Sequence, residues 1–131
     1  MAACDFDPDK ASFCSALGLI FYLEDEIVDD IFRFVLSLPP PSEIVFSFIP
    51  TDADLDGLDL EFARWLAAKV ARIGEPWKIR VRPEDIVKRI SDLGFREVFY
   101  LSPELVHARY LYGRSDKLAT PHFEQMIAAA V

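Results

Sequence analysis

The side chains that could do chemistry in this 131-residue sequence are few and scattered. His107 and His122 are its two histidines, and without a third ligand at a metal-binding spacing each is predicted to be a surface or structural residue. Four aspartates could bind a hard cation, but the run lacks the glycine and the terminal glutamate of a calcium loop. We therefore predict no metal site and assign no catalytic residue. The aspartates are Asp52, Asp54, Asp56 and Asp59.

Motifs that build a ready-made catalytic centre are also missing from the sequence. There is no G-x-G, no phosphate loop, no HExxH, no G-x-S-x-G and no CxxC. Cys4 and Cys14 match neither a zinc nor a redox spacing, which indicates a reduced, cytoplasmic protein. Several tryptophans and tyrosines could line an apolar pocket, although such residues are more often part of a core.

The charge balance argues against nucleic acid as a partner, and the distribution of apolar residues argues against a membrane. A formal net charge of -8 and a pI near 4.7 oppose binding to nucleic acid, which needs clustered lysines and arginines. The locally basic residues Lys78, Arg80 and Arg82 alternate with apolar ones, so they share one face of an extended segment; a solvated face is favoured over an anion site. No apolar run is long enough for a membrane span, and the first ten residues are acidic, so we expect no membrane and no export.

Strand and helix patterns alternate along the chain. Residues 13–23 form a nearly continuous apolar run, which predicts a strand buried on both faces. Helical spacing places Leu66 and Ile90 on the apolar stripes of two different helices, which makes both of them predicted core residues. The predicted elements are strands at 13–23, 43–49 and 96–101, helices at 24–38, 60–73, 83–93 and 102–112, and a last segment, 126–131, taken as a strand although a helix is an alternative.

This alternation over short connections predicts an α/β fold. We expect a mostly parallel sheet of about four strands with helices on both faces, in a single domain over residues 1–131. The residues alone therefore indicate an α/β domain that has no self-sufficient active site.

Three passages together resemble a known family. They are FDPDKASFCSALGLIFYL followed by EDEIVDDIF, then LSLPPPSEIVFSFIP, and then GEPWKIRVRPEDIVKRISDLGFREVFYLSPELVHARYLYGRSDKL. In their order and spacing they are similar to the C-terminal portion of leucine carboxyl methyltransferase-like enzymes, which use S-adenosylmethionine. Arg82 departs from the family's capping acid before Pro83, and Lys117 stands where the family tends to have glycine.

The resemblance implies a partial Rossmann-like class I methyltransferase fold whose N-terminal, cofactor-binding half is absent from this sequence. That half would carry the glycine-rich turn after the first strand and the carboxylate for the ribose. Of the cofactor site only the fourth-strand side would be present, so weak or absent binding of S-adenosylmethionine is expected. Its residues would be Ala16, Leu17, Gly18 and Leu19.

Three hypotheses on function follow from this resemblance. The chain is a truncated methyltransferase that is inactive alone, or a binding module that uses the former substrate cleft, or one half of a split enzyme whose partner chain supplies the cofactor-binding half. We also expect a homodimer, because run 13–23 would lie at a sheet edge; coverage of that edge by residues 1–11 is the alternative. The candidate substrate-binding residues are Tyr22, Trp65, Trp77, Arg109 and Tyr110.

Overall fold

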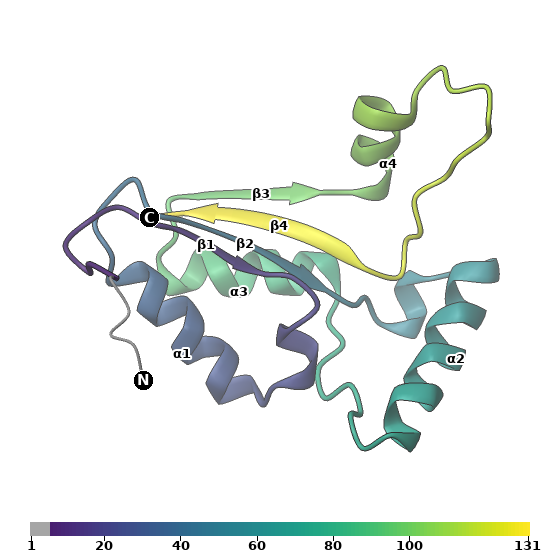
Figure 1. Cartoon of the computed structure of the whole chain (residues 1–131), viewed down its shortest axis with the longest axis horizontal. Coiled ribbons are helices and arrows are strands. Elements are labelled where there is room, and N and C mark those ends of the chain that lie inside the picture. The colour runs from purple at the N-terminus through teal and green to yellow at the C-terminus, as the bar shows by residue number, and fades with distance from the viewer. Residues whose placement is uncertain (1–5) are drawn as a thin grey trace.

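A computed structural model describes residues 6–131, which fold around one four-stranded sheet (Figure 1). The strand order is β1-β2-β4-β3; β1 and β2 are parallel, whereas β4 is antiparallel to both β2 and β3. The α/β class is confirmed, but the sheet is mixed and the prediction of a mostly parallel sheet is wrong. The strands are β1 (Phe13–Ala16), β2 (Glu43–Phe48), β3 (Glu97–Leu101) and β4 (Gln125–Ala130).

The direction of β4 explains this correction. Strand β3 is antiparallel to β4 and therefore parallel to β2, so both strands end at the same edge of the sheet. The chain leaves β3 at this edge and begins β4 there, and β4 must run back between its two neighbours. Hydrophobic periodicity reports which face a residue occupies and carries no information on strand direction.

The longer helices do not cover both faces of the sheet. Figure 1 shows α1 (Asp25–Leu36) and α3 (Pro83–Leu93) on the same face, while the short α4 (Pro103–Val106) lies on the other side, next to the end of β3. Helix α2 (Gly57–Arg72) lies beside the sheet. Helices therefore lie on both faces of the sheet, as predicted, but the second face carries only the short α4 and its π-helical turn.

The core lies between the sheet and the face that α1 and α3 cover. Alternate residues of β2 point toward these helices, as a strand with one buried face requires. The rings of Phe32 and Phe46 are 5.0 Å apart, and Ile90 is fully buried, which confirms it as a core residue. Helix α3 is also as predicted, with Pro83 in its first turn and Gly94 in the left-handed conformation (φ 119°) at its end.

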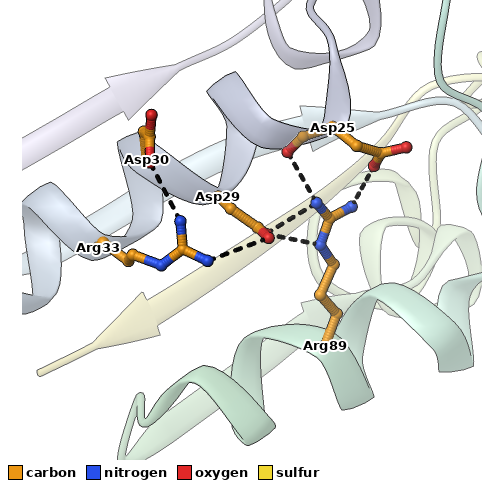
Figure 2. A network of polar contacts seen from close by, with 5 residues as sticks. All are labelled: Asp25, Asp29, Asp30, Arg33 and Arg89. Atoms are coloured by element: carbon orange, nitrogen blue, oxygen red, sulfur yellow. Dashed lines mark hydrogen bonds and ion pairs between the residues drawn. The ribbon is translucent and has the colours of Figure 1, made fainter.

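An ion-pair network clamps α1 to α3 (Figure 2). The Arg89 guanidinium donates to Asp29 at 2.9 Å and to Asp25 at 2.7 Å. Burial lowers the pKa of Arg89, but the hydrogen bonds to Asp25 and Asp29 outweigh burial and raise it overall. Arg33 adds pairs with Asp30 at 3.1 Å and with Asp29 at 3.5 Å. A hollow of about 410 Å³ lies beside Arg89, and most of the charged residues that border it are paired within the fold: Arg89 with Asp29, and Lys88 with Asp92.

Run 13–23 is not one buried strand. Strand β1 ends at Ala16, and Gly18 takes a positive φ of 64°, which a turn requires and a side chain disfavours. A single 3-10 turn follows at Ile20–Tyr22 and buries Ile20 and Phe21. Phe13 is 68% exposed, because it lies on the sheet face away from α1 and α3. Because the turn at Gly18 interrupts the run, Phe13 is exposed while Ile20 and Phe21 are buried, and the prediction of one strand buried on both faces is wrong.

The last two predicted elements are confirmed. Ser102 caps α4 by accepting a hydrogen bond from the Leu105 N–H at 3.3 Å, and a π-helical turn, His107–Leu111, continues the helix. The final segment is the strand β4. No helix in residues 6–131 is long and apolar enough to cross a membrane.

Helix α2 departs most from its predicted packing. Only Ala63 of this helix is buried, while Leu66 is half-buried, so the assignment of Leu66 to the core is wrong. The reason is the position of α2 beside the sheet, where one narrow side of the helix touches the rest of the molecule.

Candidate functional site

An apolar groove lies between α4, the π-helical turn and the start of β4. Its volume is about 330 Å³. Leu101, at the end of β3, and Met126, near the start of β4, pair across the sheet and form its floor. We call this the α4 groove; its lining residues are Leu101, Pro103, Val106, Tyr110, Thr120, Pro121, Glu124, Gln125 and Met126.

A chain of hydrogen bonds fixes the end of the groove at Gln125. The Tyr100 hydroxyl donates to the Gln125 side-chain oxygen, and the Gln125 amide donates to the His122 carbonyl at 2.9 Å. Burial raises the pKa of Tyr100 to about 12, with a further contribution from the charge of Glu104. The Tyr100 hydroxyl therefore remains a neutral donor at neutral pH, and Gln125 is held in place from both ends.

A smaller hollow of about 190 Å³ continues the α4 groove over the sheet. The two share Leu101, Tyr110 and Met126, and the smaller hollow extends to Val45 of β2. The Arg109 guanidinium lies 5.1 Å from the centre of the Phe99 ring, where it places a positive charge over an apolar surface. An apolar molecule in the groove would therefore have one cation within reach.

The predicted cofactor segment lies at the same edge of the sheet. The Gly18 N–H donates to the Ser47 hydroxyl at 2.7 Å, and Ser47 pairs with Met126, which pairs with Leu101. Residues 16–19 and the α4 groove thus occupy two ends of one row across the sheet. This row lies at the carboxyl ends of β1, β2 and β3, the edge where open α/β sheets bind ligands.

Three of the five predicted substrate-binding residues lie away from the groove. Tyr22 and Trp77 both pack on Phe21, with ring centres 4.9 and 5.8 Å from it, and so belong to an aromatic cluster that fixes the segment after β1. Trp65 lies on the exposed side of α2 and is 54% exposed. Only Arg109 and Tyr110 line the groove or its extension.

The acidic loop, residues 52–59, and the basic segment, residues 78–82, both form ion pairs within the fold, several of them with each other. Asp52 accepts hydrogen bonds from Arg64, at 2.8 Å, and from Arg80, and these two contacts, in that order, lower the pKa of Asp52. Arg82 contacts Asp54 at 3.3 Å, and Lys78 contacts Glu24 at 2.7 Å. The basic residues therefore connect parts of the fold, and this role differs from both the solvated face and the anion site considered above.

Both histidines lie on the other side of α4. His107 and His122 line a hollow of about 300 Å³ together with Glu104, whose pKa is lowered chiefly by the hydrogen bond with Ser102. In residues 6–131 no group of three or more histidine, cysteine or acidic residues is placed to hold a metal ion. Cys14 forms no disulfide among these residues, and Cys4 lies outside them.

The sequence did not reveal most of the residues that line the groove. Leu101, Val106 and Met126 are ordinary apolar residues of predicted elements, and nothing in their types separates them from core residues. Their separation along the chain, up to 25 residues between Leu101 and Met126, hides the fact that they meet. The π-helical turn is a local signal of a functional site, but it is visible only in the structure.

No family model and no curated protein matches this sequence. Among solved structures, the chain is similar to a "putative methyltransferase" from Thermobifida fusca YX (TM-score 0.60, 19% identity, 95% of this chain and 45% of that one). It is also similar to a "putative O-methyltransferase" from Nostoc punctiforme PCC 73102 (TM-score 0.56, 11% identity, 97% and 33%) and to a DUF574 family protein from Streptomyces avermitilis MA-4680 (TM-score 0.55, 16% identity, 95% and 46%).

At these identities the likeness concerns the fold alone. This chain spans between one third and just under one half of the length of the three structures. The four-stranded mixed sheet and its helices therefore form a methyltransferase-like fold that corresponds to part of each of these larger proteins.

Proposed function

We propose that this chain forms the substrate-side part of an S-adenosylmethionine-dependent O- or carboxyl-methyltransferase, as its resemblance to the leucine carboxyl methyltransferase-like group implies. The observation that carries the proposal is the row that joins Gly18, through Ser47 and Met126, to the α4 groove. It gives the predicted cofactor side and an apolar cavity a common edge of the sheet. The fold likeness to methyltransferase structures supports the same conclusion.

In this proposal the groove positions the methyl acceptor. Tyr110 provides an apolar wall above the floor that Leu101 and Met126 form, and Arg109 orients a polar group over the sheet. Methyl transfer depends chiefly on holding donor and acceptor at reacting distance, so shape and orientation are the main contributions of such a wall.

The residues present do not by themselves fit S-adenosylmethionine. The only backbone N–H that Gly18 offers is already bound to Ser47, and the 131 residues contain no glycine-rich turn. We propose instead that a segment outside these residues, in the same protein or in a partner chain, supplies the glycine-rich half.

The face of the sheet away from α1 and α3 supports this role for another segment. Its side chains include Phe13 on β1 and Phe99 on β3, which are 68% and 42% exposed. In the fold that the resemblance implies, helices of the cofactor-binding half cover this face. A sheet with large exposed apolar groups and an unpaired edge at β1 favours association.

Calorimetric titration with S-adenosylmethionine tests the proposal. For the 131-residue chain we expect a dissociation constant weaker than about 10 μM, which corresponds to roughly 7 kcal/mol of binding. The product of any adjacent reading frame that encodes a strand followed by G-x-G is then added. Cofactor affinity should appear only in the mixture, and Phe13→Asp should weaken it.

Two outcomes contradict the proposal. Tight binding of the cofactor by these 131 residues alone would show that no second segment is needed. A complete G-x-G segment that associates with the chain and still binds no cofactor would leave the methyltransferase assignment without support.

The second candidate function is a binding module that needs no cofactor. It is favoured by one observation: the α4 groove is lined by residues that the structure describes, and one of them, Gln125, is held in place by the hydrogen bond from Tyr100. Binding of apolar molecules by the chain, together with no gain of cofactor affinity when a G-x-G segment is added, distinguishes this function from the first.

A further inference from the structure

The outer side of α2 is apolar although it faces away from the rest of the molecule. Leu58 and Trp65 on this helix are 83% and 54% exposed, while Ala63 on the inner side is fully buried. Figure 1 shows α2 beside the sheet, at the margin of the molecule. An ordinary surface helix carries one apolar stripe toward its own core. A second, outward group of apolar residues indicates a contact with another surface.

Helix α2 is held firmly enough to present such a surface. Asp59 accepts the His122 N–H at 2.8 Å, and the rings of Phe62 and Phe123 are 4.9 Å apart. Arg64 pairs with Asp52 at 2.8 Å. These contacts tie the first half of the helix to the loop before β4 and to the acidic loop, and they leave its outer side uncovered.

Helical spacing defines the outer side, because residues three, four or seven apart share one side of a helix. We call it the α2 outer face. All of its residues are exposed: Leu58, Glu61, Trp65, Ala68, Lys69 and Arg72.

The charges and the shape of the α2 outer face are complementary to those of the same face on a second copy of the chain. Glu61 and Arg72 are eleven residues apart, about three turns, so they lie on the same flank, and neither forms an ion pair with another residue in 6–131. A hollow of about 230 Å³ lies between Trp65, Ala68, Lys69 and Arg72. The Lys69 ammonium lies 4.7 Å from the centre of the Trp65 ring. The surface thus has a large aromatic side chain, Trp65, next to a hollow that could receive the same side chain from another copy.

We infer that two copies of this chain associate through antiparallel α2 helices about a twofold axis. The axis passes midway between Leu66 and Ala67. Trp65 then faces Ala68 of the partner subunit and enters the hollow there, and Glu61 faces Arg72 of the partner subunit. A single register satisfies both contacts, since each pair is centred on the same point of the helix.

The alternative, parallel arrangement is disfavoured by charge. A twofold axis parallel to the helices would place Glu61 against Glu61 of the partner subunit and Arg72 against Arg72 of the partner subunit. Like charges at an interface oppose association, whereas complementary ones define orientation more than they add affinity. The outer face carries one acid and two bases, so it lacks the acidic excess that the whole chain, at net charge -8, would bring to a contact between two copies.

The inference goes beyond the methyltransferase proposal and uses a different surface. The groove and the open sheet face play no part in it, so either idea can fail alone. Trp65 should dominate the affinity, because buried aromatic anchors carry most of the energy of an interface. A helix pair of this length buries less than the ~1,600 Å² of a standard interface, so we expect a micromolar dimer.

Sedimentation velocity over a range of protein concentrations tests the dimer. The unmodified chain should shift from monomer to dimer, and Trp65→Glu should weaken the dimer by at least about tenfold. Glu61→Arg and Arg72→Glu, each alone, should also weaken it, because each creates a like-charge pair. The double variant, Glu61→Arg with Arg72→Glu, should recover most of the association. All these positions are exposed, so folding is checked by circular dichroism and should not change.

Phe13→Asp is the matched control, since it adds a charge at a 68% exposed aromatic residue on the edge strand β1. The dimer should survive this change. With fluorinated tryptophan, the Trp65 signal should shift on dimerisation while that of Trp77 should not. A monomer at every concentration overturns the inference. So does a dimer that Phe13→Asp abolishes and Trp65→Glu leaves intact, and failure of the double variant to recover overturns the antiparallel register.

Discussion

The Gly18 N–H donates to the fully buried Ser47 hydroxyl at 2.7 Å, and this contact joins the turn after β1 to the end of β2. This contact is needed because Gly18 lies two residues beyond the end of β1, has a positive φ, and its N–H is outside the sheet ladder. The side chain of Ser47 replaces the lost strand partner.

Ser47→Ala should therefore destabilise the protein. The change leaves the Gly18 N–H without its acceptor at a part-buried position, which typically costs about 1–3 kcal/mol. Urea denaturation measures the difference. Ser15→Ala, at an exposed position of β1, is the control and should stay within about 0.5 kcal/mol of the unmodified protein. Equal effects of the two substitutions would mean that the Gly18–Ser47 hydrogen bond contributes nothing.

A second prediction concerns Leu66 and Ile90, which have the same helical pattern and different burial. Ile90→Ala removes a fully buried side chain and should cost about 2–5 kcal/mol. Leu66→Ala removes a half-buried one from α2, so its cost should be clearly smaller. Denaturation of both variants under the same conditions provides the comparison. A larger loss for Leu66→Ala than for Ile90→Ala would show that α2 packs against the core.

These two residues show what the sequence could and could not reveal. Local signals predicted α3 well, because Pro83 and Gly94 mark its ends through backbone constraints that act on neighbouring residues. Periodicity also placed α2 correctly along the chain. It did not reveal that α2 leaves the sheet, since the same apolar stripe can face a core, a loop or another molecule.

The candidate site was less accessible to prediction. Arg109 and Tyr110 line the groove or its extension, whereas Trp65, chosen for its residue type, lies on the exposed side of α2. That any of the five binds a substrate stays a prediction. Met126 was overlooked because its role depends on its strand partners in β2 and β3. Long-range pairing decides such roles, and a single sequence does not display it.

A third prediction follows from the raised pKa of Tyr100. Its value in the folded protein is about 12, above the ordinary value of 10.0, so the folded state favours the protonated hydroxyl. This contribution to stability is complete below pH 10 and is lost as the pH rises through about 12. In Tyr100→Phe, the free energy of unfolding should depend less on pH in that window.

Spectrophotometric titration of the tyrosines provides the direct measurement. In the unmodified protein one tyrosine should ionise later than the other three, and Tyr100→Phe should remove that late step. A late step that persists in the variant would assign it to another tyrosine and would contradict the raised pKa that burial gives to Tyr100.

The last prediction is that the α4 groove binds small apolar molecules without a cofactor, and that Met126 reports it. Met126 lines the groove and is the single methionine of residues 6–131, so selective labelling of methionine methyl groups provides an NMR signal that reports on the groove. Addition of indole should shift the Met126 signal in a saturable way, because the groove is lined mainly by apolar side chains.

Tyr110→Ala removes one wall of the groove and should weaken indole binding by roughly fivefold, or about 1 kcal/mol. Tyr112→Ala is the control: Tyr112 is 83% exposed and does not line the groove, so affinity should not change. Equal weakening by both substitutions, or no saturable shift of Met126, would show that indole binds elsewhere or not at all and would remove the support for a binding module.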